Sequence, residues 1–408
     1  VIARGFLGDP EKFYLTTLLT RIMFPFLLFI SLAALVMGVL NSTGNFGPPA
    51  FSSAVYNLVN IATILLLAPY FQEPVKAAAI GVTLGGLAQF LMQLPALHRQ
   101  GLSIALLKPT FPLHAGVVKM GRLILPTIFG LSVTQVNLLV NTFLASYLPL
   151  GSVSYLYYGM RLIHFPLGIF AVALSTALLP TLSSQAAKKD FASLSRSFSF
   201  GLRFVFFITF PALLGLIVFR VPIVQTLFER GAFDRAATLG TADALLFYAL
   251  GLWAFAGVRI VVPVFYALQD TKTPVKIGIF AMLINLVLNL LLMRFMEHRG
   301  LALATSLAAV FNFLVLLIVL KQKIHWTDGK RILVSHLKVM LSSLVLLIPA
   351  YWISGQALWE MEGRGAMKAG VLTIGMLTSG VGYVVVQYLL KSEELYFLKA
   401  LIKKRLQR

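Results

Sequence analysis

Long apolar runs alternate with short polar connections along the whole chain. A helix that crosses a bilayer needs about 20 mostly apolar residues. Eleven runs approach or exceed that length: 14–41, 51–70, 75–97, 122–147, 153–184, 199–219, 241–267, 275–293, 301–320, 333–354 and 368–390. The runs do not alternate polar and apolar residues as the strands of a lipid-facing barrel must. We therefore predict an all-α fold, a polytopic bundle of transmembrane helices.

Composition agrees with a membrane protein. Of the 408 residues, 59% are hydrophobic and only 12% are charged, whereas an ordinary soluble domain has about 25% charged residues. The chain has no cysteine, which excludes a disulfide framework and a thiolate metal site. It also has no GxxxxGK(S/T) phosphate-binding loop, so we expect no direct use of ATP. We predict no catalytic residue, no metal site, no cofactor and no enzyme activity.

Positive charge is concentrated in alternate connections. The formal net charge is +20. Nearly all of the excess lies in one alternating set, while the other set is almost neutral; the basic set comprises 42–50, 98–123, 185–203, 268–276, 321–338 and the tail from 391. Lysine and arginine favour the cytoplasmic side of a membrane, so we predict a multi-pass protein with a cytoplasmic C-terminus. Nucleic-acid binding, which needs basic residues gathered on one folded face, is not expected.

Two segments, 39–91 and 267–314, follow the same plan. Each has a polar turn with a proline, a helix with two nearby asparagines, a basic residue and a helix of small residues. Parallel repeats of this kind build transporters whose substrate site lies between two halves; chance similarity between apolar segments is the alternative. Three predicted helices precede the second copy and none precedes the first. We therefore expect about eleven of fourteen helices here and an N-terminally incomplete first lobe.

The repeat also predicts the domain organisation, in two parallel-repeat lobes followed by a C-terminal helix pair. The ranges that we expect are 1–97 for the remaining half of the first lobe, 98–123 for a cytoplasmic linker, 124–322 for a second lobe of six helices, 333–390 for the helix pair, and 391–408 for a basic cytoplasmic tail.

Three stretches carry a family resemblance: NTFLASYLPLGSVSYLYYGMRLIHFPLGIFAVALSTALLPTLS (141–183), LFERGAFD (227–234) and FYALQDTKTPVKI (265–277). On these residues the chain resembles the lipid II flippase family of peptidoglycan synthesis (MurJ, formerly MviN), within the MOP superfamily of exporters. The resemblance implies transport of lipid II, or a related undecaprenyl-diphosphate-linked substrate, from the inner to the outer leaflet of the bacterial cytoplasmic membrane. It implies two lobes that rock by alternating access around a cationic cavity, and a groove for the lipid tail at the last two helices.

Among the basic and titratable side chains within the predicted spans, four are candidates for substrate binding. Arg161 and His164 are about one helical turn apart and face the same way, and Arg21 and Arg259 each precede a proline by four residues. A charge in the bilayer usually faces a cavity or the bundle interior, and a guanidinium suits phosphate oxygens. The resemblance implies an arginine of the substrate cavity at Arg161, so we expect these four residues to bind substrate. Arginines that snorkel to the surface, and a histidine that is merely hydrogen-bonded, are the alternatives.

Asparagines at helical spacing suggest an ion site. Asn285 and Asn289 share one helix face, as do Asn137 and Asn141, and Thr305 lies on the next helix. The resemblance implies that some relatives bind sodium at the positions of Asn285, Asn289 and Thr305, but this chain has no carboxylate there. Hydrogen bonding between helices is the alternative. Coupling to Na⁺ or H⁺ is left open, and we expect a monomer whose other partners are membrane lipids.

Competing functions remain on the sequence alone. One is another MOP-type exporter of polyprenyl-linked polysaccharide precursors or of cationic drugs, although a drug exporter should have acidic residues in its cavity. Another is a membrane glycosyltransferase or lipid phosphatase, which would need carboxylates or a histidine and arginine set at the interface. A third is a transport-inactive membrane scaffold.

Overall fold

The computed structural model describes residues 4–102, 116, 118, 121, 132, 135–324, 328–355, 357–361 and 363–406. Over these residues all regular structure is helical, which confirms the all-α prediction. Eight helical runs among them are long and apolar enough to cross a membrane, and a bent pair adds a ninth if it counts as one span. The chain divides into an N-terminal unit, Phe6–Leu125, and a C-terminal unit, Val1–Gly5 with Pro126–Arg408.

Helix α4 is the centre of the N-terminal unit, because the other long helices of this unit all pack against it. Small residues permit close approach between membrane helices. Gly81 of α4 lies against Asn60, and a side chain at Gly86 would collide with the ring of Phe26. The elements from the N-terminus to the end of this unit's described part are η1 (Arg4–Gly8), α1 (Pro10–Met23), α2 (Phe26–Ser42), α3 (Gly47–Leu67), η2 (Ala68–Tyr70) and α4 (Val75–His98).

The predicted span over 14–41 is present, and it is broken at Phe24 and Pro25 into α1 and α2. Proline has no N–H to donate to the carbonyl four residues earlier, here that of Arg21, so the hydrogen-bond ladder of the helix is interrupted. The two pieces together, Pro10–Ser42, still form one apolar stretch long enough to span a bilayer.

The C-terminal unit has one main apolar core, built from the inward faces of α6, α8, α10, α11 and α12. Its elements are the helix Gln135–Ala145, α6 (Ser152–Pro166), η3 (Leu167–Val172), α7 (Ala173–Ala187), α8 (Phe191–Val218), α9 (Arg220–Phe228), α10 (Arg235–Ala249), α11 (Leu252–Ala267), α12 (Lys272–Ile324), α13 (Gly329–Ser343), η4 (Leu344–Leu346), α14 (Leu347–Ser354), η5 (Ala357–Trp359), α15 (Gly365–Leu389) and α16 (Glu393–Leu406).

The predicted helix over 241–267 is bent. Its two halves, α10 and α11, meet at an angle of 44°. A glycine is needed at the joint, because a Cβ on Gly251 would collide with Ser306 of α12. Two other runs stay continuous but change helix type along their length. A π-helical turn, η3, follows Pro166 in the run 153–184, and a 3₁₀ turn, η4, interrupts the run 333–354.

Helix α12 contains two predicted spans. Glu297 has φ 51° and ψ −132°, so the helix is broken there. The break lies between the predicted runs 275–293 and 301–320, which are therefore separate helices as expected. Because a non-glycine residue rarely adopts a positive φ, this turn is held by its surroundings. A side chain at Gly300 would collide with the carbonyl of Leu292.

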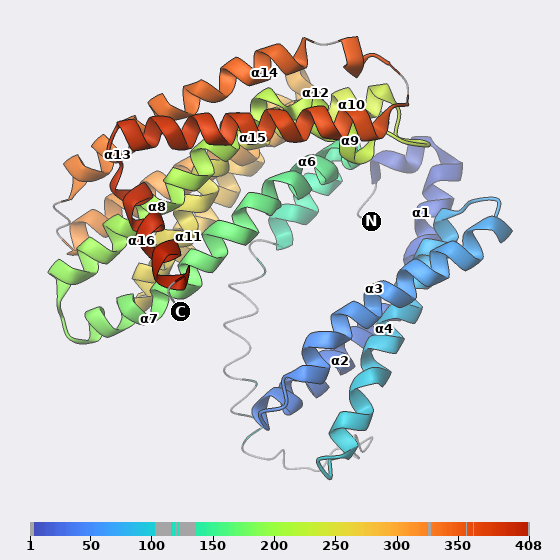
Figure 1. Cartoon of the computed structure of the whole chain (residues 1–408). Helices are drawn as coiled ribbons and strands as arrows, with labels where there is room; N and C mark the ends of the chain where they lie inside the picture. The colour runs from blue at the N-terminus through green and yellow to red at the C-terminus, as the bar shows by residue number, and fades with distance from the viewer. Residues whose placement is uncertain are drawn as a thin grey trace. The chain divides into compact units, whose positions relative to one another are not determined.

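The last helices pack on the core of the C-terminal unit. Helix α15 contacts both α13 and α14, and α13 and α14 contact α8; these helices are the orange and red ribbons in Figure 1. The hydroxyl of Tyr383 on α15 donates to the carbonyl of Phe207 on α8 at 2.6 Å, and the bond is buried. The predicted pair of C-terminal helices is therefore fixed to the rest of this unit by polar contacts as well as apolar ones.

Candidate functional site

Helix α6 presents the side chains that the sequence singled out. On one face, Gly159 packs closely against Ala244 of α10, and Ile163 is fully buried. Arg161 and His164 lie on the exposed side of the same helix. The guanidinium of Arg161 lies 5.8 Å from the ring centroid of Tyr157, within range of a cation–π interaction.

Helix α11 adds a second arginine. Arg259 is exposed while its neighbour Ile260 is buried, so the apolar face of α11 enters the core and Arg259 stays outside it. Arg161 and Arg259 are both close enough to His164 to act on it electrostatically. The structure therefore brings together three of the four predicted substrate-binding residues.

No ion pair neutralises this group: among the described residues, neither Arg161 nor Arg259 has a carboxylate within ion-pair distance. Arginine stays protonated at any physiological pH. The group is therefore a source of positive potential on an exposed face, and it can attract a multiply charged anion. Arg21 is exposed too, on the last turn of α1 in the N-terminal unit, and its grouping with the other three stays a prediction.

The predicted asparagines form one hydrogen-bonded cluster in the C-terminal unit. The side-chain amide of Asn289 donates to Asn141 Oδ1 at 2.7 Å and to Asn285 Oδ1 at 2.9 Å. Asn141 donates to Asn137 Oδ1 at 3.1 Å. The amide of Asn285 approaches the hydroxyl of Thr305 at 3.4 Å. Three helices are thus joined by neutral groups, as the hydrogen-bonding alternative expects.

One acceptor in this asparagine cluster remains unused. Asn289 is fully buried, and its Oδ1 atom has no hydrogen-bond partner among the described residues. An unsatisfied buried oxygen is unfavourable by about 1–3 kcal/mol. It is the one observation in the cluster that points toward a cation ligand instead of a closed network.

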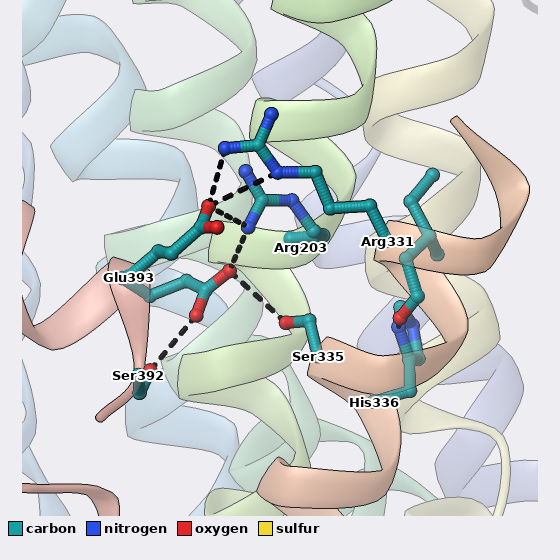
Figure 2. A network of polar contacts seen from close by, with 8 residues as sticks. Arg203, Arg331, Ser335, His336, Ser392 and Glu393 are labelled. Atoms are coloured by element: carbon teal, nitrogen blue, oxygen red, sulfur yellow. Dashed lines mark hydrogen bonds and ion pairs between the residues drawn. The ribbon is translucent and has the colours of Figure 1, made fainter. Parts of the chain in front are cut away.

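A second polar cluster lies where α8, α13 and α16 meet, and sequence reasoning missed it (Figure 2). Arg203 of α8 is buried, and its Nη1 lies 2.5 Å from Glu394 Oε1 and 2.9 Å from Glu393 Oε2. Arg331 of α13 pairs with the same oxygen of Glu393 at 2.7 Å. Ser335 donates to Glu394 at 3.0 Å. Two arginines and two glutamates are therefore balanced in one network.

The arginines of this network change the pKa of one of its carboxyl groups. Hydrogen bonding from Arg331, supported by Arg203, lowers the pKa of Glu393 below its ordinary value. The available sequence signal was a pair of acids, Glu393 and Glu394, at the start of an otherwise basic tail. That signal does not name the partner, because Arg203 is 191 residues away from Glu394.

Comparison with known proteins identifies the family. A family model described as "Lipid II flippase MurJ" matches residues 1–363. The chain belongs to the MurJ family. It is 38% identical over 380 residues to the probable lipid II flippase MurJ of Vibrio cholerae, covering 90% of this chain and 71% of the relative. It is 39% identical over 358 residues to the corresponding Haemophilus influenzae protein, covering 86% of this chain and 68% of the relative.

Solved structures agree with membership in the MurJ family. A lipid II flippase MurJ in an inward closed conformation matches with a TM-score of 0.73 at 26% identity, covering 91% of this chain and 74% of that one. A multidrug resistance MATE family transporter of the MOP superfamily matches with a TM-score of 0.63 at 14% identity, covering 76% of this chain and 72% of that one; this likeness concerns the fold. The predicted family and the multi-span membrane fold are confirmed.

Proposed function

We propose that this chain is a lipid II flippase, which moves the lipid-linked peptidoglycan precursor from the inner to the outer leaflet of the bacterial cytoplasmic membrane by alternating access. The observation that carries this proposal is the match of the MurJ family model across residues 1–363. The uncompensated cations on α6 and α11 supply the chemistry, because the diphosphate of lipid II is an anion and an exposed pair of guanidinium groups can bind its oxygens.

In this mechanism Arg161 and Arg259 bind the diphosphate or the neighbouring sugar, and His164 adds a hydrogen bond. Arg21, in the N-terminal unit, is the fourth residue that we expect to bind substrate. We keep the domain assignment given above: 1–97, 98–123, 124–322, 333–390 and 391–408. No bond is made or broken, so the protein is a transporter without a catalytic residue, metal or cofactor. It acts as a monomer, with its C-terminus in the cytoplasm.

Membrane potential is a sufficient source of drive, because moving one charge across the membrane is worth about 2.3 kcal/mol per 100 mV. A second hypothesis is coupling to sodium at Asn285, Asn289 and Thr305, and the unpaired Asn289 Oδ1 favours it. Neutral oxygens hold sodium weakly, so replacing Na⁺ by K⁺ in the transport assay distinguishes the two. A rate that does not change assigns these residues to helix packing.

The test of the main proposal is translocation of lipid II in proteoliposomes, with the rate measured as the fraction of lipid II exposed to an externally added enzyme. Arg161→Gln should lower the rate by at least about tenfold, because charge-assisted hydrogen bonds are worth about 1.5–3 kcal/mol. Arg161→Lys keeps the charge but loses the planar guanidinium, so its rate should lie between those of the unsubstituted chain and Arg161→Gln. Arg196→Gln, at an exposed arginine near the start of α8, is the matched control and should keep the full rate.

Three outcomes contradict the proposal. If the unsubstituted chain moves polyprenyl-linked polysaccharide precursors but not lipid II, it is a different MOP-type exporter. If it moves neither while remaining folded, it is a transport-inactive scaffold. If Arg161→Gln and Arg196→Gln behave alike, the cations of α6 have no part in substrate binding.

A further inference from the structure

A crevice lies in the C-terminal unit between the end of α8 and the helices that follow it. Its volume is about 770 Å³, and its walls come from the end of α8 and from α9, α10, α14 and η5. The residues that matter for its chemistry are Arg220, Arg235, Leu239, Leu347, Tyr351 and Trp359. None of them belongs to the group around Arg161, and the flippase mechanism leaves them without a role.

Arg220 supplies an uncompensated cation to this crevice. Its Nη1 donates to the carbonyl of Ile217 at 2.9 Å, while its Nε is buried and has no hydrogen-bond partner among the described residues. No described carboxylate lies within ion-pair distance of it. A half-buried guanidinium whose described bond is to a carbonyl retains its full charge and has donors left over, so it can bind an anion.

Arg235 adds a second cation that is only loosely held. Its Nη1 lies 3.9 Å from Glu229 Oε2 and 3.5 Å from the carbonyl of Trp359. Glu229 is already engaged by Thr238 and Gln225, each at 2.7 Å. The crevice lining contains two arginines and one exposed carboxylate, Glu360, so its net charge is positive.

The rest of the lining is apolar and aromatic. Leu239 and Leu347 form part of the wall, and Tyr351 is 83% exposed beside Trp352, which is 76% exposed. Tyrosine and tryptophan gather where a membrane meets water. The crevice thus combines groups that can bind phosphate with an apolar and aromatic wall, as a site for a lipid at the membrane–water interface would.

We propose that this crevice binds an anionic phospholipid. The phosphate lies against Arg220 and Arg235, and an acyl chain follows Leu239, Leu347 and Tyr351. Charge complementarity selects this occupant, because a zwitterionic lipid would bring its own cation to the arginines. With the C-terminus in the cytoplasm, as in the proposed function, the crevice opens to the outer leaflet. Since the crevice joins the core helices to α14, the lipid bridges the core and the C-terminal helix pair.

Quenching of tryptophan fluorescence tests this proposal, since Trp359 lines the crevice. The purified chain is placed in vesicles that contain phosphatidylglycerol with brominated acyl chains in both leaflets, so the result does not depend on orientation. Brominated phosphatidylglycerol should quench more strongly than brominated phosphatidylcholine at the same mole fraction. Arg220→Gln with Arg235→Gln should remove the excess and weaken binding by about tenfold or more.

Arg230→Gln is the matched control, because Arg230 is exposed on the α9–α10 connection but does not line the crevice. It should keep the full excess quenching. Arg220→Lys should keep part of it, which guards against a variant that fails to fold. Equal quenching by the two lipids, or full excess in the double variant, overturns the proposal. Displacement of the bound phosphatidylglycerol by millimolar inorganic phosphate also overturns it, because the apolar wall would then contribute nothing. Displacement of the phosphatidylglycerol by lipid II at low mole fraction overturns it too, because the crevice would then belong to the transport path.

The proposed lipid site and the proposed flippase activity can be disproved independently of each other. In vesicles without anionic phospholipid, the double variant Arg220→Gln with Arg235→Gln should translocate lipid II at the same rate as the unsubstituted chain. Arg161→Gln should in turn leave the excess quenching unchanged.

Discussion

Arg203 of α8 and Arg220 of α9 illustrate two uses of one residue type. Arg203 is buried and shares two carboxylates, Glu393 and Glu394. Arg220, just beyond the end of α8, donates to a carbonyl and has no described carboxylate partner. An arginine whose charge is already balanced holds helices together, whereas an arginine whose charge is not balanced remains available to a ligand.

The largest expected change in stability comes from replacing Arg203, whose charge is balanced by carboxylates. Arg203→Met leaves the buried Glu394 carboxylate without its cation, and such a loss destabilises by about 3–5 kcal/mol. We expect that decrease in the free energy of unfolding, measured by denaturant titration in mixed micelles. The double variant Arg203→Met with Glu394→Gln should recover a substantial part of it. Arg196→Met, at an exposed arginine of the same helix, is the control. If Arg203→Met is as stable as Arg196→Met, the network does not contribute to stability.

Disrupting the neutral asparagine cluster should lower the free energy of unfolding by an intermediate amount. Asn289→Ala removes two donors and leaves Asn141 Oδ1 and Asn285 Oδ1 without their bond from Asn289. Unsatisfied buried acceptors cost about 1–3 kcal/mol, so the same titration should give a decrease in that range. Thr373→Ala, at an exposed hydroxyl of α15 that bonds only its own helix, is the control and should change stability little. Equal changes in the two variants contradict the structural role of the cluster.

The unbalanced arginine should matter little to folding. Arg220→Met removes one bond to a carbonyl and relieves an uncompensated charge, so the free energy of unfolding without anionic lipid should change by at most about 1 kcal/mol. With phosphatidylglycerol present, the unsubstituted chain should gain stability by ligand binding and the variant should not. A loss as large as that of Arg203→Met would remove the distinction between the two arginines.

The smallest effect is a pH dependence at Glu393. Its pKa is lowered in the folded chain, so its ion pair stabilises the fold above the unfolded-state pKa, and this contribution is lost as pH falls through the folded pKa. Because Glu393 is 55% exposed, the contribution should be below about 1 kcal/mol. The stability difference between the unsubstituted chain and Glu393→Gln should be present at pH 7 and shrink below about pH 4.5. A difference that grows in acid would contradict this pairing.

The fold was predictable where the information is local. The length of an apolar run decides whether a helix can cross a membrane, and the runs 51–70, 75–97 and 368–390 correspond to α3, α4 and α15. The break at Pro25 also has a local cause. The bend between α10 and α11 does not, because it depends on how closely Gly251 approaches Ser306 of another helix.

The candidate site divides in the same way. An arginine within an apolar run can be recognised from the sequence, so Arg161 and Arg259 could be proposed before the structure. That both arginines lie within electrostatic range of His164 could be learned only from the fold. Arg203 and Arg220 gave no comparable signal, because each looked like an ordinary charge at the end of a span.

By itself, the sequence determined the all-α membrane fold and the family, since these follow from run length and local motifs. The sidedness inferred from lysine and arginine stays a prediction. Only the tertiary structure decided which charges are balanced. A carboxylate 191 residues away neutralises Arg203, while Arg220 faces a crevice walled by α9, α10, α14 and η5. Charge balance depends on distance in space, and distance along the chain does not predict it.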